Sequence, residues 1–252
     1  PFLVTPEGRI VTYGDLLAQS RRFAAGLKAL GVAPGDRVTA QIEKSPDALF
    51  LYFGCLWLGA VYMPLNTGYT QAELEYFVGD AEPALYIHDP AATPPKGVRT
   101  FTLAADGSGT LIEALPAASD LPRADLPDIA QAAMLYTSGT TGRPKGAMIP
   151  RRALASNAAT LANLWRFTAE DVLLHALPVF HVHGLFVATN TVLAAGASMR
   201  FHAKFEAAAV LADMPHASVL MGVPTFYTRL LQAPDVLRDA ARTMRLFVSG
   251  SA

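Results

Sequence analysis

Helix-like and strand-like patterns of hydrophobic residues alternate along the chain. After a short β-like segment near the N-terminus, apolar residues recur with a helical period up to Gly31. The apolar run 38–42 predicts a strand, and Ser45 followed by Pro46 predicts the N-cap and first residue of a buried helix. The next strand is predicted at 61–65.

A capping box formed by Thr70 and Glu73 predicts the helix that follows, and a strand is predicted at 84–87. Between residues 89 and 128 the periodicity fades. Pro, Ala and small polar residues dominate there, apart from one short strand predicted near 101–103. This irregular connection is the best candidate for an internal boundary.

Beyond the connection the alternation resumes. Strands are predicted at 132–136, 172–177, 199–202, 218–223 and 245–248, and helices at 152–165, 184–195, 206–214 and 225–232. The pattern predicts an α/β fold of mostly parallel sheets flanked by helices. We expect one subdomain at 1–128 and a second at 129–252, truncated at its C-terminal end because no helix follows the last strand.

Composition supports a compact chain and narrows its partners. Of 252 residues, 52% are hydrophobic and 16% are charged, below the roughly 25% charged that is typical of globular domains. The formal charge of −1 argues against nucleic acid as a partner. The single cysteine, Cys55, excludes an internal disulfide and favours a reducing, cytoplasmic setting. Long uncharged stretches at 48–65 and 172–199 contain Gly and Pro residues, which favours buried elements over membrane spans.

The segment 136–146, YTSGTTGRPKG, carries the strongest chemical indication. It combines three glycines with hydroxyl residues and two cations directly after a predicted strand. Glycines let backbone N–H groups approach a triphosphate, hydroxyls can ligate Mg²⁺, and Lys145 can offset phosphate charge. The segment is not a Walker A sequence, because Gly146 follows the lysine. On composition alone, a flexible surface loop is the alternative.

This segment resembles the signature of adenylate-forming enzymes, which include acyl-CoA synthetases, luciferases and the adenylation domains of peptide synthetases. Further segments resemble the same family in the expected order: 61–70 (VYMPLNTGYT), 178–186 (PVFHVHGLF), 221–231 (MGVPTFYTRLL) and 247–252 (FVSGSA). Within the family, residues 175–190 and 220–231 look most like malonyl-CoA synthetases. The resemblance implies an acid–CoA ligase that forms an acyl-AMP from ATP and then an acyl-CoA from coenzyme A.

The resemblance also implies roles for individual residues. The ATP phosphates would be held by Thr137, Ser138, Gly139, Thr140, Thr141, Gly142 and Lys145, with Thr137 near Mg²⁺. His183 matches the family histidine beside the carboxylate and the α-phosphate, and together with Lys145 it would be catalytic. Small residues that match acyl-pocket positions are Gly250, Ser251 and Ala252. Arg229 would pair with the second carboxylate of malonate or methylmalonate.

Simpler interpretations stand beside these roles. Arg229 has the pattern of an ordinary surface arginine, and residues 250–252 that of an ordinary turn. A zinc site formed by His181 and His183 with His175 or His202 is a weaker alternative, because the acidic and cysteine ligands that would complete it are missing nearby. A core position is the expectation for His181.

The resemblance places several family parts beyond Ala252, namely the adenine-binding segment, the acidic Mg²⁺ ligand, the ribose-binding aspartate and the C-terminal domain with its catalytic lysine. We therefore expect this chain to be inactive alone and to need its own missing C-terminal region. Two other functions stay open. One is an adenylating enzyme that loads an acyl group on a carrier protein, and the other is a non-catalytic binding fragment.

Overall fold

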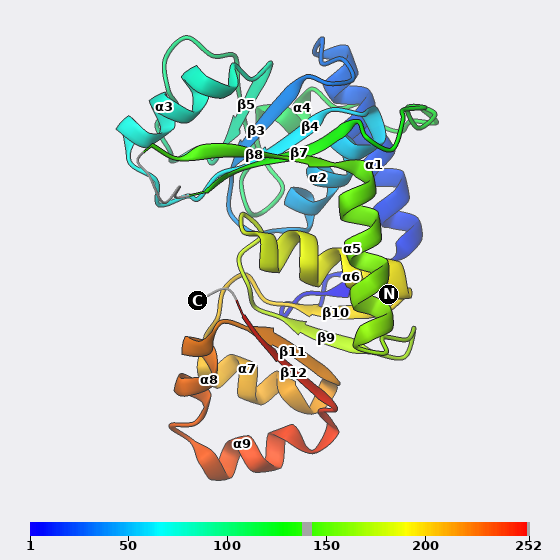
Figure 1. The fold of residues 1–252 in the computed structure, drawn as a ribbon, viewed down its shortest axis with the longest axis vertical. Coiled ribbons are helices and arrows are strands. Elements are labelled where there is room, and N and C mark those ends of the chain that lie inside the picture. Colours follow the sequence, from blue (N-terminus) through cyan, green and yellow to red (C-terminus); the bar gives the residue numbers. More distant parts are fainter. Residues whose placement is uncertain (138–142, 251–252) are drawn as a thin grey trace. The chain divides into compact units, whose positions relative to one another are not determined.

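The structure is a computed structural model that describes residues 1–137 and 143–250 (Figure 1). The chain packs into two compact units. Residues 14–154 form what we call the loop unit, and residues 1–13 with 155–252 form what we call the cavity unit. Within the described residues, each unit contains one six-stranded sheet. The α/β class predicted from the sequence is confirmed.

The loop unit has the strand order β6-β5-β3-β4-β7-β8. Its strands are β3 (Arg37–Gln41), β4 (Val61–Pro64), β5 (Leu85–His88), β6 (Thr100–Thr102), β7 (Gln131–Thr137) and β8 (Lys145–Pro150). Neighbours are parallel except β7 and β8, which form an antiparallel pair at one edge. Its helices are α1 (Tyr13–Ala29), α2 (Pro46–Leu58), α3 (Gln71–Ala81) and the short α4 (Thr110–Glu113).

Helices α2 and α3 of the loop unit begin where the capping residues predict. The Ser45 hydroxyl accepts a hydrogen bond from the Ala48 amide at 3.1 Å, with Pro46 as the first residue of α2. Thr70 and Glu73 form both bonds of a capping box at the start of α3. These caps satisfy amide groups that would otherwise lack a partner at each helix start.

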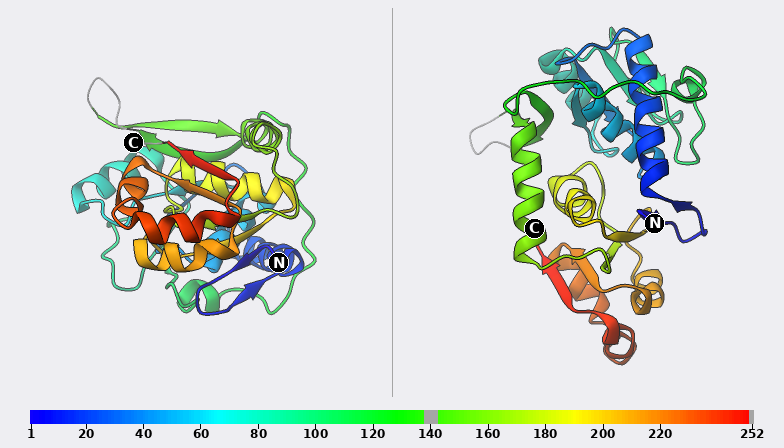
Figure 2. Two further views of the ribbon diagram at one scale, coloured as in Figure 1. Left: turned by 90° about the horizontal axis from the view of Figure 1, so that it is seen from below. Right: turned by 90° about the vertical axis from the view of Figure 1, so that its right-hand side faces the viewer.

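The cavity unit has the strand order β12-β11-β9-β10-β1-β2. Its strands are β1 (Leu3–Val4), β2 (Ile10–Val11), β9 (Val172–His175), β10 (Ser198–Phe201), β11 (Val219–Gly222) and β12 (Leu246–Ser249). Neighbours are parallel except β1 and β2. The blue N-terminal strands and the red strand β12 therefore occupy opposite edges of this sheet (Figure 2).

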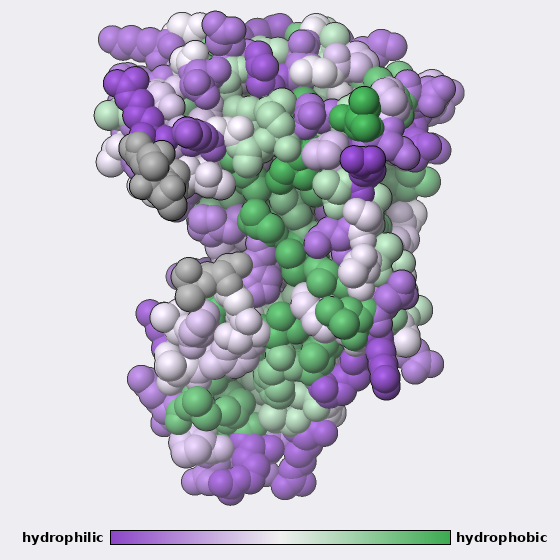
Figure 3. Space-filling view, viewed as in Figure 1, coloured by the Kyte–Doolittle hydropathy of each residue, from purple (hydrophilic) through white to green (hydrophobic). Residues whose placement is uncertain are grey.

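Helical segments accompany the sheet of the cavity unit: most of α5 (Arg151–Leu164), the π-helix η1 (His183–Thr189), α6 (Asn190–Ala195), α7 (Ala207–Asp213), η2 (Met214–His216), α8 (Pro224–Leu230), α9 (Pro234–Ala240) and η3 (Ala241–Thr243). A buried cluster that includes Leu174, Val210 and Leu220 joins α7 to the sheet. Hydrophilic residues dominate the visible surface over α9 (Figure 3). Ion pairs there join Asp235 to Arg238 and Asp239 to Arg242.

Several elements differ from the sequence predictions, among them the short β1 and α4, which were not predicted. Residues 145–150 form strand β8, although no strand was predicted there. Residues 183–189 form a π-helix within the predicted helix 184–195, and α9 was not predicted. The compact units also divide the chain differently from the boundary at residue 128, because β7 and β8 join the sheet of the loop unit. The irregular connection 89–128 lies inside that unit.

None of the helices in the described parts of the chain is long and apolar enough to cross a membrane. The uncharged stretch 48–65 contains most of α2, which ends at Leu58, and then the whole of β4. A left-handed Gly59 terminates that helix, with φ of 86°. The second stretch, 172–199, is likewise divided among strands and two consecutive helical segments.

Candidate active site

The β7–β8 hairpin carries the described ends of the predicted phosphate loop. Thr137 is the last residue of β7 and Lys145 the first of β8, and the two pair across the hairpin. Both are exposed. The other predicted phosphate contacts lie outside the described residues: Ser138, Gly139, Thr140, Thr141 and Gly142. The hairpin therefore holds a hydroxyl and a cation opposite each other where the loop leaves and re-enters the sheet.

Helix α3 contacts both arms of this hairpin. The Tyr136 hydroxyl donates to Asp80 Oδ2 at 2.6 Å, and the Tyr136 ring lies 4.3 Å from that of Phe77. On the other arm, the Tyr76 hydroxyl donates to the Pro144 carbonyl at 2.9 Å. Burial, followed by the bond to Asp80, raises the pKa of Tyr136, which therefore stays a neutral donor. One helix thus fixes the residues that flank the loop on both sides.

A cavity of about 270 Å³ lies in the cavity unit beyond the end of β9. Its lining residues are Leu177, Pro178, His181, Val182, His183, Gly184 and Val223. The walls are thus largely apolar with two imidazoles among them, a composition typical of small-molecule sites.

His183 begins the π-helix η1 and is only 6% exposed. Its Nδ1 atom is buried without a hydrogen-bond partner among the described residues. Burial lowers the pKa of His183, and a hydrogen bond with the Gly250 backbone opposes that shift. A neutral imidazole with an unpaired buried nitrogen is suited to bond a polar ligand.

Gly250 lies beside this histidine. A Cβ atom placed on Gly250 would come 3.9 Å from His183 Cε1. A larger side chain at this position would therefore extend against the imidazole. The other two predicted pocket residues, Ser251 and Ala252, lie outside the described residues.

His181 corrects the prediction of a core histidine, because its side chain is exposed and lines the cavity. Its ring packs edge-on against Phe180, with centroids 4.7 Å apart, and the partial burial of the imidazole lowers its pKa. His181 belongs to the motif segment 178–186. That membership could have indicated a place in the site, but the sequence prediction did not use it.

The zinc alternative does not assemble. No group of three metal-ligating His, Cys, Asp or Glu side chains occurs among residues 1–137 and 143–250. His175 Nε2 lies 2.9 Å from the Gly184 carbonyl oxygen, and His202 Nε2 lies 2.8 Å from Asp213 Oδ2. These two histidines are therefore bonded to protein groups.

Arg229 lies on α8 with an exposed side chain and does not line the cavity. Its helix, however, begins directly after the lining residue Val223. The structure therefore places Arg229 on an element that extends from the cavity wall, and its predicted carboxylate contact stays a prediction.

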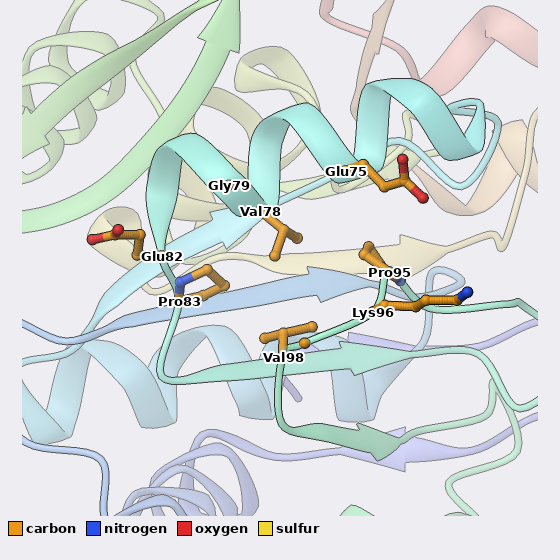
Figure 4. A pocket seen from close by; sticks show the side chains of 9 residues that line it. Glu75, Val78, Gly79, Glu82, Pro83, Pro95, Lys96 and Val98 are labelled. Atoms are coloured by element: carbon orange, nitrogen blue, oxygen red, sulfur yellow. The ribbon is translucent and has the colours of Figure 1, made fainter.

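A second recess, of about 530 Å³, lies beside α3 in the loop unit (Figure 4). Val78 and Val98 face each other across it, and its charged members are Glu75, Glu82 and Lys96. It contains none of the predicted site residues. The histidine cavity and the hairpin are therefore the two candidate functional regions.

A glycine-rich hairpin loop on an α/β fold, with a histidine-lined cavity, fits a nucleotide-using enzyme that also binds a small organic molecule. Residues 1–252 match the family model of AMP-binding enzymes. The chain belongs to this family.

Curated relatives include a feruloyl-CoA synthase from Amycolatopsis sp, which is 32% identical over 97% of this chain and 50% of its own length. An indoleacetate–CoA ligase from Aromatoleum aromaticum is 30% identical over 98% of this chain and 51% of its own length. The chain thus spans about half the length of these relatives.

Among solved structures, ATP-bound MatB from Rhodopseudomonas palustris is 48% identical, with a TM-score of 0.94 over 100% of this chain and 52% of that one. The inhibitor-bound N-terminal domain of FACL13 from Mycobacterium tuberculosis has a TM-score of 0.88 at 29% identity. The match covers 66% of the FACL13 chain and 100% of this chain.

Proposed function

We propose that this chain is part of a cytoplasmic, ATP-dependent acid–CoA ligase whose substrate is malonate or methylmalonate. The observation that carries the proposal is the 48% identity to MatB, a malonyl-CoA synthetase, over the whole chain. Feruloyl- and indoleacetate-activating relatives share 30–32%. Segments 175–190 and 220–231, which resemble malonyl-CoA synthetases, include two histidines of the cavity and Arg229.

In the first half-reaction, a carboxylate oxygen of the acid bonds to the α-phosphorus of ATP. The bond from that phosphorus to the pyrophosphate oxygen breaks, which gives acyl-AMP and pyrophosphate. Negative charge develops on the leaving pyrophosphate. Lys145, which is exposed, is assigned to stabilise that charge with its ammonium group. The exposed Thr137 hydroxyl would supply an oxygen ligand for Mg²⁺, which would neutralise phosphate charge when bound.

His183 is assigned to the acid. Its imidazole is neutral because burial lowers its pKa, so it bonds the reacting carboxylate without forming a full ion pair that would weaken the nucleophile. Arg229 is assigned to the second carboxylate, and Gly250, Ser251 and Ala252 are assigned to the acyl pocket. In the second half-reaction the coenzyme A thiol attacks the acyl carbon, and AMP leaves.

The test uses the full-length protein. We expect malonate to stimulate exchange of labelled pyrophosphate into ATP, and malonyl-CoA to form only after coenzyme A is added. Exchange that responds to ferulate but not to malonate would overturn the substrate assignment. Acyl transfer to a carrier protein but not to coenzyme A would support the carrier-loading alternative instead.

We also propose that the 252-residue chain cannot complete the cycle by itself, since it spans about half the length of its relatives. The purified chain should form no malonyl-CoA in an assay sensitive to a single turnover. Repeated turnover by this chain would contradict the proposal.

A further inference from the structure

The start of the π-helix η1 is hydrogen-bonded to the last residue of the central strand β9. A π-helix is uncommon because its hydrogen bonds run from residue i to i+5, and such segments often occur at functional sites. Here it begins at His183, the buried histidine of the cavity.

The Gly184 carbonyl, directly after that histidine, accepts two side-chain hydrogen bonds. The Thr189 hydroxyl donates at 2.9 Å, and His175 Nε2 lies at 2.9 Å. A carbonyl oxygen can only accept, so Nε2 carries the hydrogen in this bond. Thr189 Oγ1 lies 3.3 Å from the same nitrogen, which closes a three-membered network.

Both donors are rigidly placed. His175 is 1% exposed and Thr189 is 0% exposed. His175 ends β9 and pairs with Phe201 of β10 on one side and Met221 of β11 on the other. Gly184 packs closely against the backbone of Pro178, because a Cβ atom there would overlap the Pro178 carbonyl. The hydrogen bonds from these two buried side chains therefore restrain the backbone next to His183.

We infer that His175 and Thr189 are positioning residues for His183, which they hold in the orientation that bonds the reacting acid. This inference rests on the proposed function. Positioning matters because a displacement of about 1 Å in a reacting group can lower a rate by roughly 100-fold.

Thr191 provides a matched control two residues further along. It is buried to the same degree as Thr189, at 0% exposure, but its hydroxyl has no hydrogen-bond partner among the described residues. Thr189→Val and Thr191→Val thus make the same chemical change in neighbouring buried positions. Only the first removes a bond to the Gly184 carbonyl.

The experiment measures pyrophosphate exchange by the full-length enzyme with malonate. We expect Thr189→Val to lower kcat by roughly 10- to 100-fold, with KM for ATP within about twofold of wild type. Thr189→Ser should restore most of the rate, and Thr191→Val should match wild type. Equal losses in both valine variants, or no loss in Thr189→Val, would overturn the inference.

A second pair of variants covers a failure of Thr189→Val to fold. His175→Gln keeps an N–H donor near the position of Nε2, whereas His175→Leu removes it. The glutamine variant should retain more kcat than the leucine variant, and equal rates would overturn the inference. Wild-type enzyme that exchanges pyrophosphate with no acid would instead contradict the proposed function, so the two failures are distinct.

Discussion

The two candidate regions present their functional groups in opposite ways. At the β7–β8 hairpin, Thr137 and Lys145 are exposed, and the neighbouring tyrosines secure the strands. In the cavity unit, His183 is 6% exposed and sits on an irregular helix. A cation for a polyphosphate can act from an exposed loop, whereas an imidazole that must stay neutral needs burial. Substitutions at the exposed hairpin should therefore mainly lower activity, whereas substitutions near the buried His183 should also lower stability.

Lys145→Met in the full-length enzyme should give the largest loss of activity with the fold intact. Removing one such contact should weaken transition-state binding by about 2 to 4 kcal/mol, or roughly 30- to 1,000-fold in exchange rate. Lys96→Met, another exposed lysine of the loop unit, is the control and should match wild type. Unchanged exchange in Lys145→Met would refute the assignment of the hairpin to phosphate.

Gly184→Ala should mainly harm stability. The added methyl group would overlap the Pro178 carbonyl, which is backbone and cannot move aside. We expect about 3 kcal/mol of destabilisation, at the upper end for overpacking. Gly79→Ala on α3 has open space around its Cβ position and should be neutral or stabilise that helix by up to about 1 kcal/mol. Similar thermal unfolding midpoints for both variants would contradict the close approach.

Acid should weaken the cavity unit through its buried carboxylates. Burial alone would raise the pKa of Asp171, but hydrogen bonds from Arg245, Thr168 and Ser218 outweigh it and lower the pKa. The folded state then binds fewer protons than the unfolded state. Stability from this group is present above the ordinary pKa near 3.8 and is lost as pH falls through that value toward the folded pKa.

Asp171→Asn should remove about 2 kcal/mol of stability at pH 7, since it breaks charge-assisted bonds of 2.6 and 2.7 Å from Arg245. The variant should also lose less stability than wild type between pH 5 and about pH 3. Amide hydrogen exchange in β9 and β12, corrected for intrinsic pH effects, measures both. Parallel acid profiles for the two proteins would show that Asp171 does not carry this dependence.

Tyr76→Phe should have the smallest effect. It removes only the hydroxyl that donates to the Pro144 carbonyl, a bond of 2.9 Å worth about 1 kcal/mol. Because this bond supports the hairpin, KM for ATP should rise by a few fold while KM for malonate stays constant. If only the KM for malonate changed, the bond from α3 would not support ATP binding by the hairpin, and this prediction would be wrong.

Local chemistry made much of the fold predictable. Ser45 and Thr70 mark helix starts because their side chains replace missing backbone partners. The strand β8 escaped prediction because Pro144 and Gly146 indicate a loop, and its register depends on pairing with β7. Pairing of β7 and β8 with the sheet of the loop unit also explains why that unit extends to residue 154 and does not end at residue 128.

The site was predictable only in part. The motif identified Lys145 and His183 as candidates, but the exposure of His181 was not anticipated, since one residue between two histidines does not reveal which is buried. A π-helix of seven residues is also hard to separate from an α-helix by hydrophobic period. The bonds from His175 and Thr189 to Gly184 therefore became visible only in three dimensions.

We propose that the hairpin acts on ATP while the cavity unit selects the acid. The most direct test is kcat/KM for malonate divided by that for propionate, in full-length wild type, Lys145→Met and Arg229→Ala. We expect the ratio to be unchanged in Lys145→Met. In Arg229→Ala it should fall roughly 10- to 100-fold, which corresponds to about 1.5 to 3 kcal/mol for a hydrogen bond to a charged group. Equal losses for both acids in Arg229→Ala, or a changed ratio in Lys145→Met, would contradict this division of roles.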